Sequence, residues 1–171
     1  MIEEGASDLY LNRLKLMGFD HALAPRSLDS QKVRFALEGQ KFYSFLDTAA
    51  LCQFVWGPAW TLYGPQETVD FVRAATGWED FTLDELLKIG ERRLNMLRVF
   101  NGRLGITRQA DQLPEKFYRP LTGGGPTDGV ALTHEEVEGA LQEYYAQAGW
   151  DQATGIPKPE TLKRLGLEWV T

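Results

Sequence analysis

The 171-residue sequence predicts an all-α fold, an irregular multihelical bundle in one compact unit. Three observations predict it. Apolar residues recur at steps of three and four along several segments, and two Thr-x-x-Glu capping boxes each precede such a segment. The alternation of apolar and polar residues that marks β-strands is nearly absent.

The first helix is expected in the segment 40–54. Residues 1–30 contain short apolar pieces separated by breakers, which predicts a frayed or partly helical lead-in. From residue 40 to 54 the apolar residues fall on one helical face. The dipeptide Gly57-Pro58 is expected to end this helix.

Two more helices follow. One should begin at Gly64-Pro65, because Pro suits the first helical position, and should end at Gly77. The other begins after the capping box at Thr82, in which Thr82 accepts from the Glu85 amide and Glu85 reaches back. Its apolar seam comprises Leu83, Leu86, Leu87, Gly90, Leu94, Leu97, Phe100 and Leu104. Because Gly90 lies on the seam, a second backbone is expected to pack close to it.

The remaining chain holds a long connection and two more helices. The segment 105–130 is rich in Gly and Pro and predicts an irregular connection. The second capping box, at Thr133, predicts a helix that Gly149 terminates. A short helix over residues 159–165, closed by Gly166, completes the expected bundle.

Charge and composition exclude several classes of function. The sequence has 18 Lys and Arg against 24 Asp and Glu, a net charge of −6, so a nucleic-acid partner is not expected. No apolar run approaches the roughly 18 residues that a membrane span needs. The N-terminus is acidic and lacks the apolar core of a secretory signal. We therefore expect a cytoplasmic protein with no membrane partner.

Cys52 is the single cysteine, so no internal disulfide can form. Five residues before it stands Asp47. On a continuous helix the two side chains would point about 140° apart, but a helix break between them would let both face one ligand. The alternative interpretation makes Cys52 a small apolar core residue.

The other candidates for chemistry are weaker. His134 falls inside a capping box, and His21 has no metal-ligand pattern around it. The run Gly123-Gly124-Gly125 lacks the spacing of a phosphate-binding loop and predicts a connector. A dense series of arginines could form a solvated or ion-paired face, or a docking face for an acidic partner. It comprises Arg92, Arg93, Arg98, Arg103 and Arg108.

The segment from Asp47 to Gln53 resembles the second pterin-binding motif, D-x-x-G-L-C-x, of the tungsten-containing aldehyde ferredoxin oxidoreductase family. Later segments resemble the C-terminal region of the same family, in order. They are Gly90-Glu91-Arg92, Arg98 to Gly105, Asp111 to Pro114, Tyr144-Tyr145, Gly149-Trp150-Asp151, Gly155-Ile156-Pro157 and Leu165-Gly166-Leu167. The resemblance divides the chain into a loosely matched lead-in, residues 1–39, and a helical C-terminal domain of this family, residues 40–171.

The resemblance implies a role in oxidising aldehydes to carboxylic acids, with electrons passing through a [4Fe–4S] cluster to ferredoxin. It makes Cys52 the fourth cluster ligand, while Asp47 and the Leu51 main chain hold a tungstopterin, or a molybdopterin. A thiolate suits iron, and a carboxylate suits the N–H donors of a pterin. The partners implied are upstream domains of the same enzyme and ferredoxin.

Two departures from the family pattern shape these expectations. Ala50 replaces the motif glycine, and the other three cluster cysteines of the family have no counterpart in this chain. We therefore expect an excised C-terminal piece or a shortened relative. The isolated chain should be inactive and should bind none of these cofactors by itself. The surface near Phe54, Trp56 and Trp60 should then be unusually apolar. The alternative is a stand-alone helical interaction module that uses the arginine-rich face.

Overall fold

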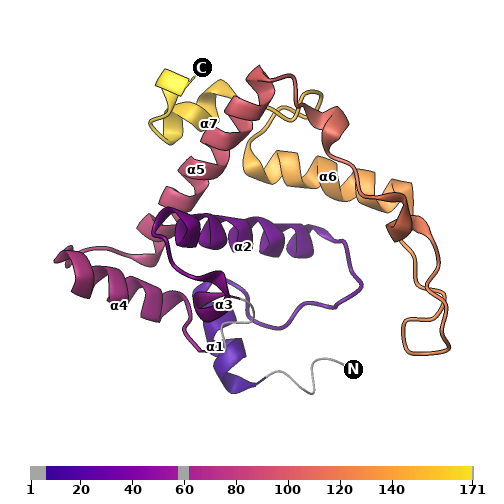
Figure 1. The fold of residues 1–171 in the computed structure, drawn as a ribbon, viewed down its shortest axis with the longest axis horizontal. Helices are drawn as coiled ribbons and strands as arrows, with labels where there is room; N and C mark the ends of the chain where they lie inside the picture. The colour runs from indigo at the N-terminus through magenta and orange to yellow at the C-terminus, as the bar shows by residue number, and fades with distance from the viewer. Residues whose placement is uncertain (1–6, 58–61, 171) are drawn as a thin grey trace.

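The computed structural model describes residues 7–57 and 62–170, and within them the fold is all-α, as predicted (Figure 1). A single bridge between Trp150 and Pro157 is the only strand-like pairing of these residues. None of their helices is long and apolar enough to cross a bilayer. The helices are α1 (Asp8–Leu16), α2 (Ser30–Thr48), α3 (Gln53–Trp56), α4 (Pro65–Thr76), α5 (Leu83–Arg103), α6 (His134–Ala148) and α7 (Pro159–Arg164). Short 3-10 turns are η2 (Arg108–Ala110), η3 (Glu115–Tyr118) and η4 (Glu168–Val170).

Helix α2 lies at the centre of the molecule. Figure 1 shows α1, α3 and α4 on one side of it and α6 and α7 on the other, while α5 runs from the first side to the second. The largest core lies on the first side, where α1, α2, α4 and the start of α5 meet. Its fully buried side chains are Leu14, Phe42, Leu46, Val69, Phe81 and Leu86.

The expected start and end of the helix at 40–54 are both wrong. Helix α2 begins ten residues earlier, because the Asp29 carboxylate accepts from the Lys32 amide at 2.9 Å and caps it. Val33 and Leu37 extend its buried face toward the N-terminus. The helix stops at Thr48, and α3 is a separate turn. Helix α2 thus crosses the expected division between residues 39 and 40.

The other helix ends largely confirm the predictions. Helix α4 has Pro65 in its first turn, and Gly77 ends it in the left-handed conformation, with φ of 72°. At α6 both halves of the capping box form, since Glu136 N donates to Thr133 at 3.1 Å and Thr133 N donates to Glu136 at 2.8 Å. At α5 Thr82 accepts from Glu85 N at 3.2 Å, but the return bond is absent among the described residues.

The expected close approach at Gly90 is confirmed. Helices α2 and α5 form the most extensive helix pairing of the structure, and Gly90 faces the Lys41 main chain at their crossing. A Cβ atom at Gly90 would lie 2.7 Å from the Lys41 carbonyl carbon and closer still to its oxygen. The two backbones can therefore touch here only because residue 90 has no side chain.

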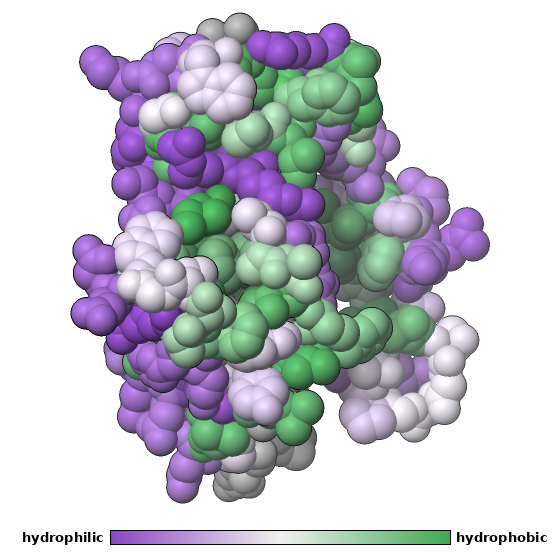
Figure 2. Space-filling view, turned by 60° about the vertical axis from the view of Figure 1, so that its left-hand side comes forward, coloured by the Kyte–Doolittle hydropathy of each residue, from purple (hydrophilic) through white to green (hydrophobic). Residues whose placement is uncertain are grey.

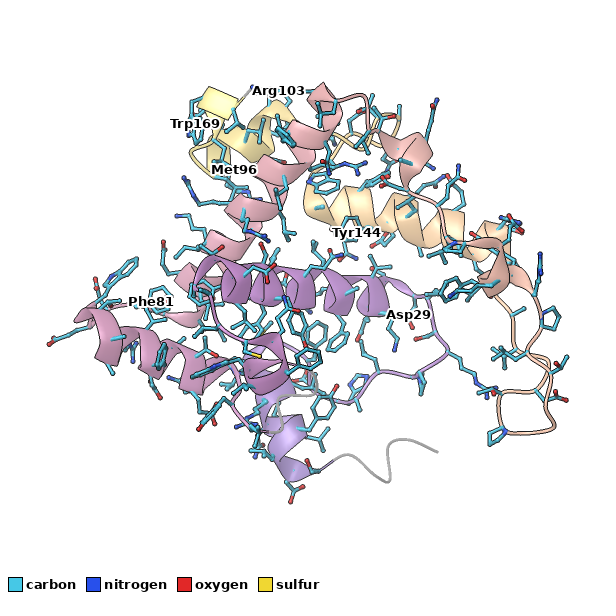
Figure 3. All side chains as sticks on the ribbon, viewed as in Figure 1. Asp29, Phe81, Met96, Arg103, Tyr144 and Trp169 are labelled. Atoms are coloured by element: carbon cyan, nitrogen blue, oxygen red, sulfur yellow. The ribbon has the colours of Figure 1, made fainter. Side chains whose placement is uncertain are left out.

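The apolar seam of α5 is buried only in part. Leu86 at its start is fully buried, whereas Leu97, Phe100 and Leu104 are 44%, 57% and 63% exposed. Toward its end α5 instead buries Val99 against the C-terminal segment, in a cluster with Leu162, Leu165, Leu167 and Val170. Arg103 donates to the Val170 carbonyl there, and Figure 3 shows Arg103 and Trp169 at this end of the molecule.

Substituting Gly90→Ala should lower the free energy of unfolding by about 2–3 kcal/mol, because the added methyl group overlaps the Lys41 carbonyl. Urea unfolding of the 171-residue chain measures this change. Gly139→Ala in α6 is the matched control, since no atom lies within 4 Å of the added Cβ. The free energy of unfolding of Gly139→Ala should rise by about 0.5–1 kcal/mol. Equal stability of the two variants would contradict the close crossing.

Candidate functional site

A tight turn joins the end of α2 to α3 and contains the residues of the predicted motif. The Leu51 amide donates to the Leu46 carbonyl at 2.9 Å, and the Ala50 amide donates to the Asp47 carbonyl at 3.4 Å. These two bonds define a Schellman motif, in which the residue after the cap takes the left-handed conformation. That residue is Ala50, with φ of 54°, the only described non-glycine residue at positive φ. The family glycine therefore corresponds to a position with a backbone reason for glycine.

Asp47 lies in the last turn of α2 and is engaged from two directions. Its Oδ2 lies 3.2 Å from Arg93 Nη1 of α5, and its Oδ1 accepts from Gln53 Nε2 of α3 at 2.7 Å. The Asp47 side chain is 42% exposed, so the ion pair contributes modestly, about 1 kcal/mol or less. Each carboxylate oxygen retains acceptor capacity toward a further donor.

Cys52 stands at the cap position of α3 and is exposed, with a free thiol. Its interpretation as a core residue is therefore wrong. The helix breaks between Asp47 and Cys52, and the bond from Gln53 ties the Asp47 carboxylate to the start of α3. An exposed thiol and a partly exposed carboxylate thus flank one short helix break.

Leu51 combines a packed side chain with an available main-chain group. Its side chain is half-buried against the main core. Its amide is used within the turn, while its carbonyl pairs with no backbone amide in the described part of the chain. That carbonyl can accept a hydrogen bond from a ligand.

Apolar surface lies next to this turn. Phe54 is 91% exposed, which meets the expectation for this surface. Trp56 is half-buried, and its ring centroid lies 4.7 Å from that of Tyr63, on which it stacks, and 5.1 Å from that of Phe71. Trp60 lies outside the described residues. Figure 2, with the α4 side turned forward, shows apolar side chains gathered across the middle of this face. An exposed apolar area of this kind is typical of a contact surface for another protein segment, a ligand or a membrane.

The arginine series does not form a free docking face. Each of the five guanidinium groups has a partner within the chain. Arg92 and Arg103 donate to the carbonyls of Leu165 and Val170, Arg93 and Arg98 pair with Asp47 and Asp111, and Arg108 pairs with Glu138. The series serves internal contacts, which leaves the interaction-module hypothesis without its proposed surface.

The histidines and the glycine run carry no site. His134 stacks on Tyr118 with ring centroids 3.8 Å apart, and His21 is exposed. The amides of Gly123 and Gly124 donate to the Asp128 carboxylate, which closes a turn of the connection. Across the described ranges, 7–57 and 62–170, no group of metal-ligating side chains converges.

A second polar cluster joins the far half of α5 to the C-terminal part of the chain. Arg98 is 8% exposed and forms a two-pronged pair with Asp111, in which Nη1 lies 2.9 Å from Oδ1. Its Nε donates to the Gly155 carbonyl at 2.7 Å, and Tyr145 donates to Asp111. Trp150 lies under the guanidinium, 5.0 Å from ring centroid to Cζ. Residues from five segments of the resemblance thus meet at one place.

The ionisation of this cluster follows from its contacts. Burial alone would raise the pKa of Asp111, but hydrogen bonds from Arg98 and Tyr145 outweigh burial and hold that pKa below its ordinary value. Burial and the bond to Asp111 raise the pKa of the Tyr145 phenol. At neutral pH the cluster therefore contains an ionised Asp111 and a protonated Tyr145.

Comparisons with known proteins show the fold and the family of this chain. The fold is shared with a chain of the structure titled "Active site complex BamBC of Benzoyl Coenzyme A reductase in complex with 1,5 Dienoyl-CoA". The TM-score is 0.66 at 23% identity, over 86% of this chain and 21% of that chain. Residues 2–167 match the family described as "Aldehyde ferredoxin oxidoreductase, domains 2 & 3". The chain belongs to this family.

Relatives in archaea are all several times longer than this chain. The tungsten-containing aldehyde ferredoxin oxidoreductase of Pyrococcus horikoshii is 34% identical over 162 residues, which are 93% of this chain and 25% of the relative. The Thermococcus kodakarensis protein of that name is 31% identical over 161 residues, again 25% of its length. An "Aliphatic sulfonate oxidoreductase, WOR-like subunit" of Pyrococcus furiosus is 31% identical over 134 residues. The chain thus spans 25% of the tungsten-containing relatives it matches.

Substituting Ala50→Gly should raise the free energy of unfolding by about 0.5–1 kcal/mol. The left-handed conformation costs an L-residue about 1–2 kcal/mol, and the greater chain entropy of glycine offsets part of that gain. Urea unfolding tests this prediction. Ala49→Gly is the control, because Ala49 has φ of −85° and gains no such relief. A loss of stability in both variants would contradict the left-handed assignment at residue 50.

Substituting Asp111→Asn should lower the free energy of unfolding by about 2–4 kcal/mol at pH 7, because it leaves Arg98 without its charge partner. The folded-state pKa of Asp111 is depressed, so the ionised carboxylate stabilises the fold above its unfolded pKa of about 3.9. This contribution is lost as the pH falls through the folded-state pKa.

The difference in free energy of unfolding between wild type and Asp111→Asn should therefore shrink below about pH 4. Urea unfolding at several pH values measures this difference. Asp80→Asn, at an exposed residue, is the control and should follow wild type at every pH. A gap of constant size down to acid pH would show that the Asp111 charge contributes nothing.

Proposed function

We propose that this chain is the cofactor-covering helical part of an oxidoreductase that oxidises aldehydes to carboxylic acids. The family is that of tungsten-containing aldehyde ferredoxin oxidoreductases. In this proposal a tungstopterin, or a molybdopterin, and a [4Fe–4S] cluster are bound between this chain and the remaining domains of the same enzyme. Ferredoxin is the electron acceptor, and the enzyme is cytoplasmic.

The donor set of the turn fits these groups. Cys52 presents an exposed thiol, and Cys thiolates are the usual ligands of four-iron clusters. Asp47 offers carboxylate acceptors and Leu51 offers a main-chain carbonyl, which suit the N–H donors of a pterin. One thiolate cannot hold a four-iron cluster by itself. The proposal therefore requires further ligands from outside this chain and an inactive isolated chain.

Each residue of the turn has a defined task in this proposal. The oxidation of an aldehyde with water releases two electrons and two protons, and the bound cofactors supply the redox chemistry for it. Asp47 orients the pterin through hydrogen bonds, while Arg93 and Gln53 hold the carboxylate in place. Cys52 anchors the cluster next to the pterin, and Phe54 adds apolar surface that keeps water away.

The observation that carries the proposal is the helix break between Asp47 and Cys52. Without the left-handed turn at Ala50, the carboxylate and the thiol would point about 140° apart. The turn removes this constraint, and in the proposal both groups face one bound cofactor assembly. The arginine contacts described above remove the specific support for the interaction-module alternative.

Anaerobic co-expression of the chain with the polypeptide that supplies the remaining family domains tests this proposal. Iron, tungsten and molybdenum analysis and the visible and EPR spectra are compared for wild type and variants. We expect Cys52→Ala to lose or alter the four-iron signal, and Asp47→Asn to lower pterin and metal content while iron is retained. Asp70→Asn, at an exposed site on α4, is the control. Wild-type cluster spectra in Cys52→Ala would overturn the assignment of the cluster ligand.

A further inference from the structure

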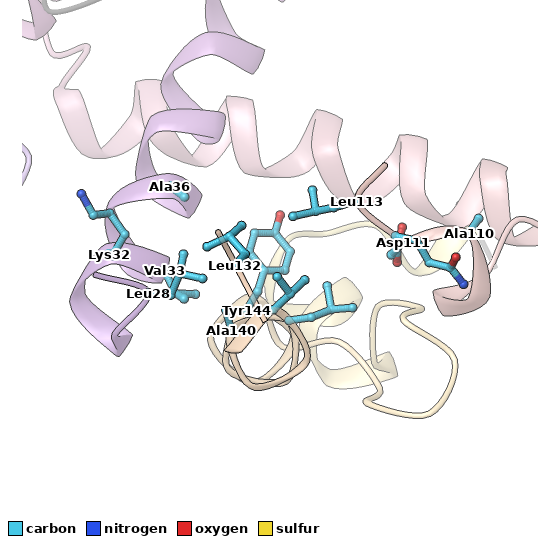
Figure 4. Close-up of a pocket in the computed structure, with 13 residues that line it drawn as sticks. Leu28, Lys32, Val33, Ala36, Ala110, Asp111, Leu113, Leu132, Ala140 and Tyr144 are labelled. Carbon is cyan, nitrogen blue, oxygen red and sulfur yellow. The ribbon is translucent and has the colours of Figure 1, made fainter. Parts of the chain in front are cut away.

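A groove between α2 and α6 lies apart from the turn that holds Asp47 and Cys52. It has a volume of about 530 Å³, within the range of small-molecule sites of roughly 300–1,000 Å³. Figure 4 shows aliphatic side chains from both helices and from the connection between α5 and α6 around the Tyr144 ring. The aliphatic and alanine residues that line it are Leu28, Val33, Ala36, Ala110, Leu113, Leu132, Val137, Ala140 and Leu141.

The groove carries little charge of its own. Figure 4 places Lys32 at its outer edge, with the ammonium group pointing away from Tyr144. Asp111 lies at the other end, where the pair with Arg98 neutralises its charge. The apolar part therefore suits an uncharged hydrocarbon body.

A second, more polar cavity of about 400 Å³ adjoins the groove. The two cavities share Asp111, Leu141 and Tyr144 as lining residues, so they lie side by side. Leu94 and Leu97 from the second half of the α5 seam line the polar cavity, together with Asn101 and Gln40. These leucines thus line a cavity.

Hydrogen-bond donors are free in the polar cavity. Tyr144 donates its hydroxyl to Gln40 Oε1 at 2.6 Å, and burial raises the pKa of Tyr144 to about 12, so this donor persists at neutral pH. The two N–H groups of the Gln40 amide take no part in this bond and remain to donate, on a side chain that is exposed to solvent. Within the described residues neither these groups nor the Asn101 side-chain amide has a partner.

We propose that the joined cavities between α2, α5 and α6 bind an elongated apolar molecule with one hydrogen-bond-accepting head group. The hydrocarbon body lies between Ala36 and Ala140, and the head accepts from Asn101 and Gln40. A head that accepts hydrogen bonds gains these contacts, whereas a head without acceptors gains none and binds more weakly. The site is independent of the proposed cofactor turn.

Titration of the 171-residue chain with decanoate, decanol and decyltrimethylammonium tests the proposal, with each probe below its micellar concentration. Calorimetry reports binding, and the change in total tryptophan fluorescence, to which Trp150 in the polar cavity contributes, is a second readout. Saturable one-to-one binding of decanoate and decanol is expected, with an affinity about tenfold or more above that of the trimethylammonium probe. Equal affinities for all three probes, or no binding, would overturn the proposal.

Two substitutions locate the binding site. Ala140→Phe fills the groove and should weaken decanol binding about tenfold or more, whereas Ala146→Phe, on an exposed position of the same helix, should not. Asn101→Leu should weaken the binding of decanoate and of decanol several-fold and leave the affinity for the trimethylammonium probe unchanged. If circular dichroism shows that Ala140→Phe does not fold, Ala36→Phe fills the groove from the opposite wall. A folded, groove-filling variant that binds like wild type would place the ligand elsewhere and overturn the assignment.

Discussion

The crossing of α2 and α5 at Gly90 is the constraint on which the candidate site depends. Because residue 90 has no side chain, the α5 backbone touches the main chain of Lys41. Arg93 follows Gly90 by about one helical turn, and Asp47 follows Lys41 by less than two. The close contact therefore brings the guanidinium of α5 to the carboxylate at the end of α2. A wider crossing would separate this pair and leave Asp47 held by Gln53 alone.

The second half of α5 organises the rest of the chain through Arg98. This buried side chain contacts the connection at Asp111 and the turn at Gly155, while Tyr145 of α6 joins through Asp111. One guanidinium thus satisfies groups from segments far apart in sequence. Breaking such a buried pair is costly, since each partner is left without its counter-charge. This geometry brings together family-like segments that are scattered along the chain.

Local signals predict the ends of α4 and α6, whereas a weak local cap and long-range contacts account for features that the sequence does not reveal. Pro65, Gly77, Thr133 and Gly149 act within one turn of their own helix, so the sequence reveals them. The start of α2 was missed because its lone cap at Asp29 has no capping box. At the site, Asp47, Leu51 and Cys52 came from the resemblance, whereas Arg93 lies on another helix and has no local signal. The positive φ of Ala50 was hidden, because alanine seldom adopts it.

The most direct test of the account is the nuclear Overhauser effect between the α-protons of Gly90 and the α-proton of Lys41 in the labelled chain. A Cβ built at Gly90 would lie 3.2 Å from the Lys41 Cα, so the two sets of protons should be close enough for a strong signal. The account predicts this signal together with helical chemical shifts throughout α2 and α5. Helical shifts in both segments without the signal would mean that the helices cross elsewhere, and this would contradict the account.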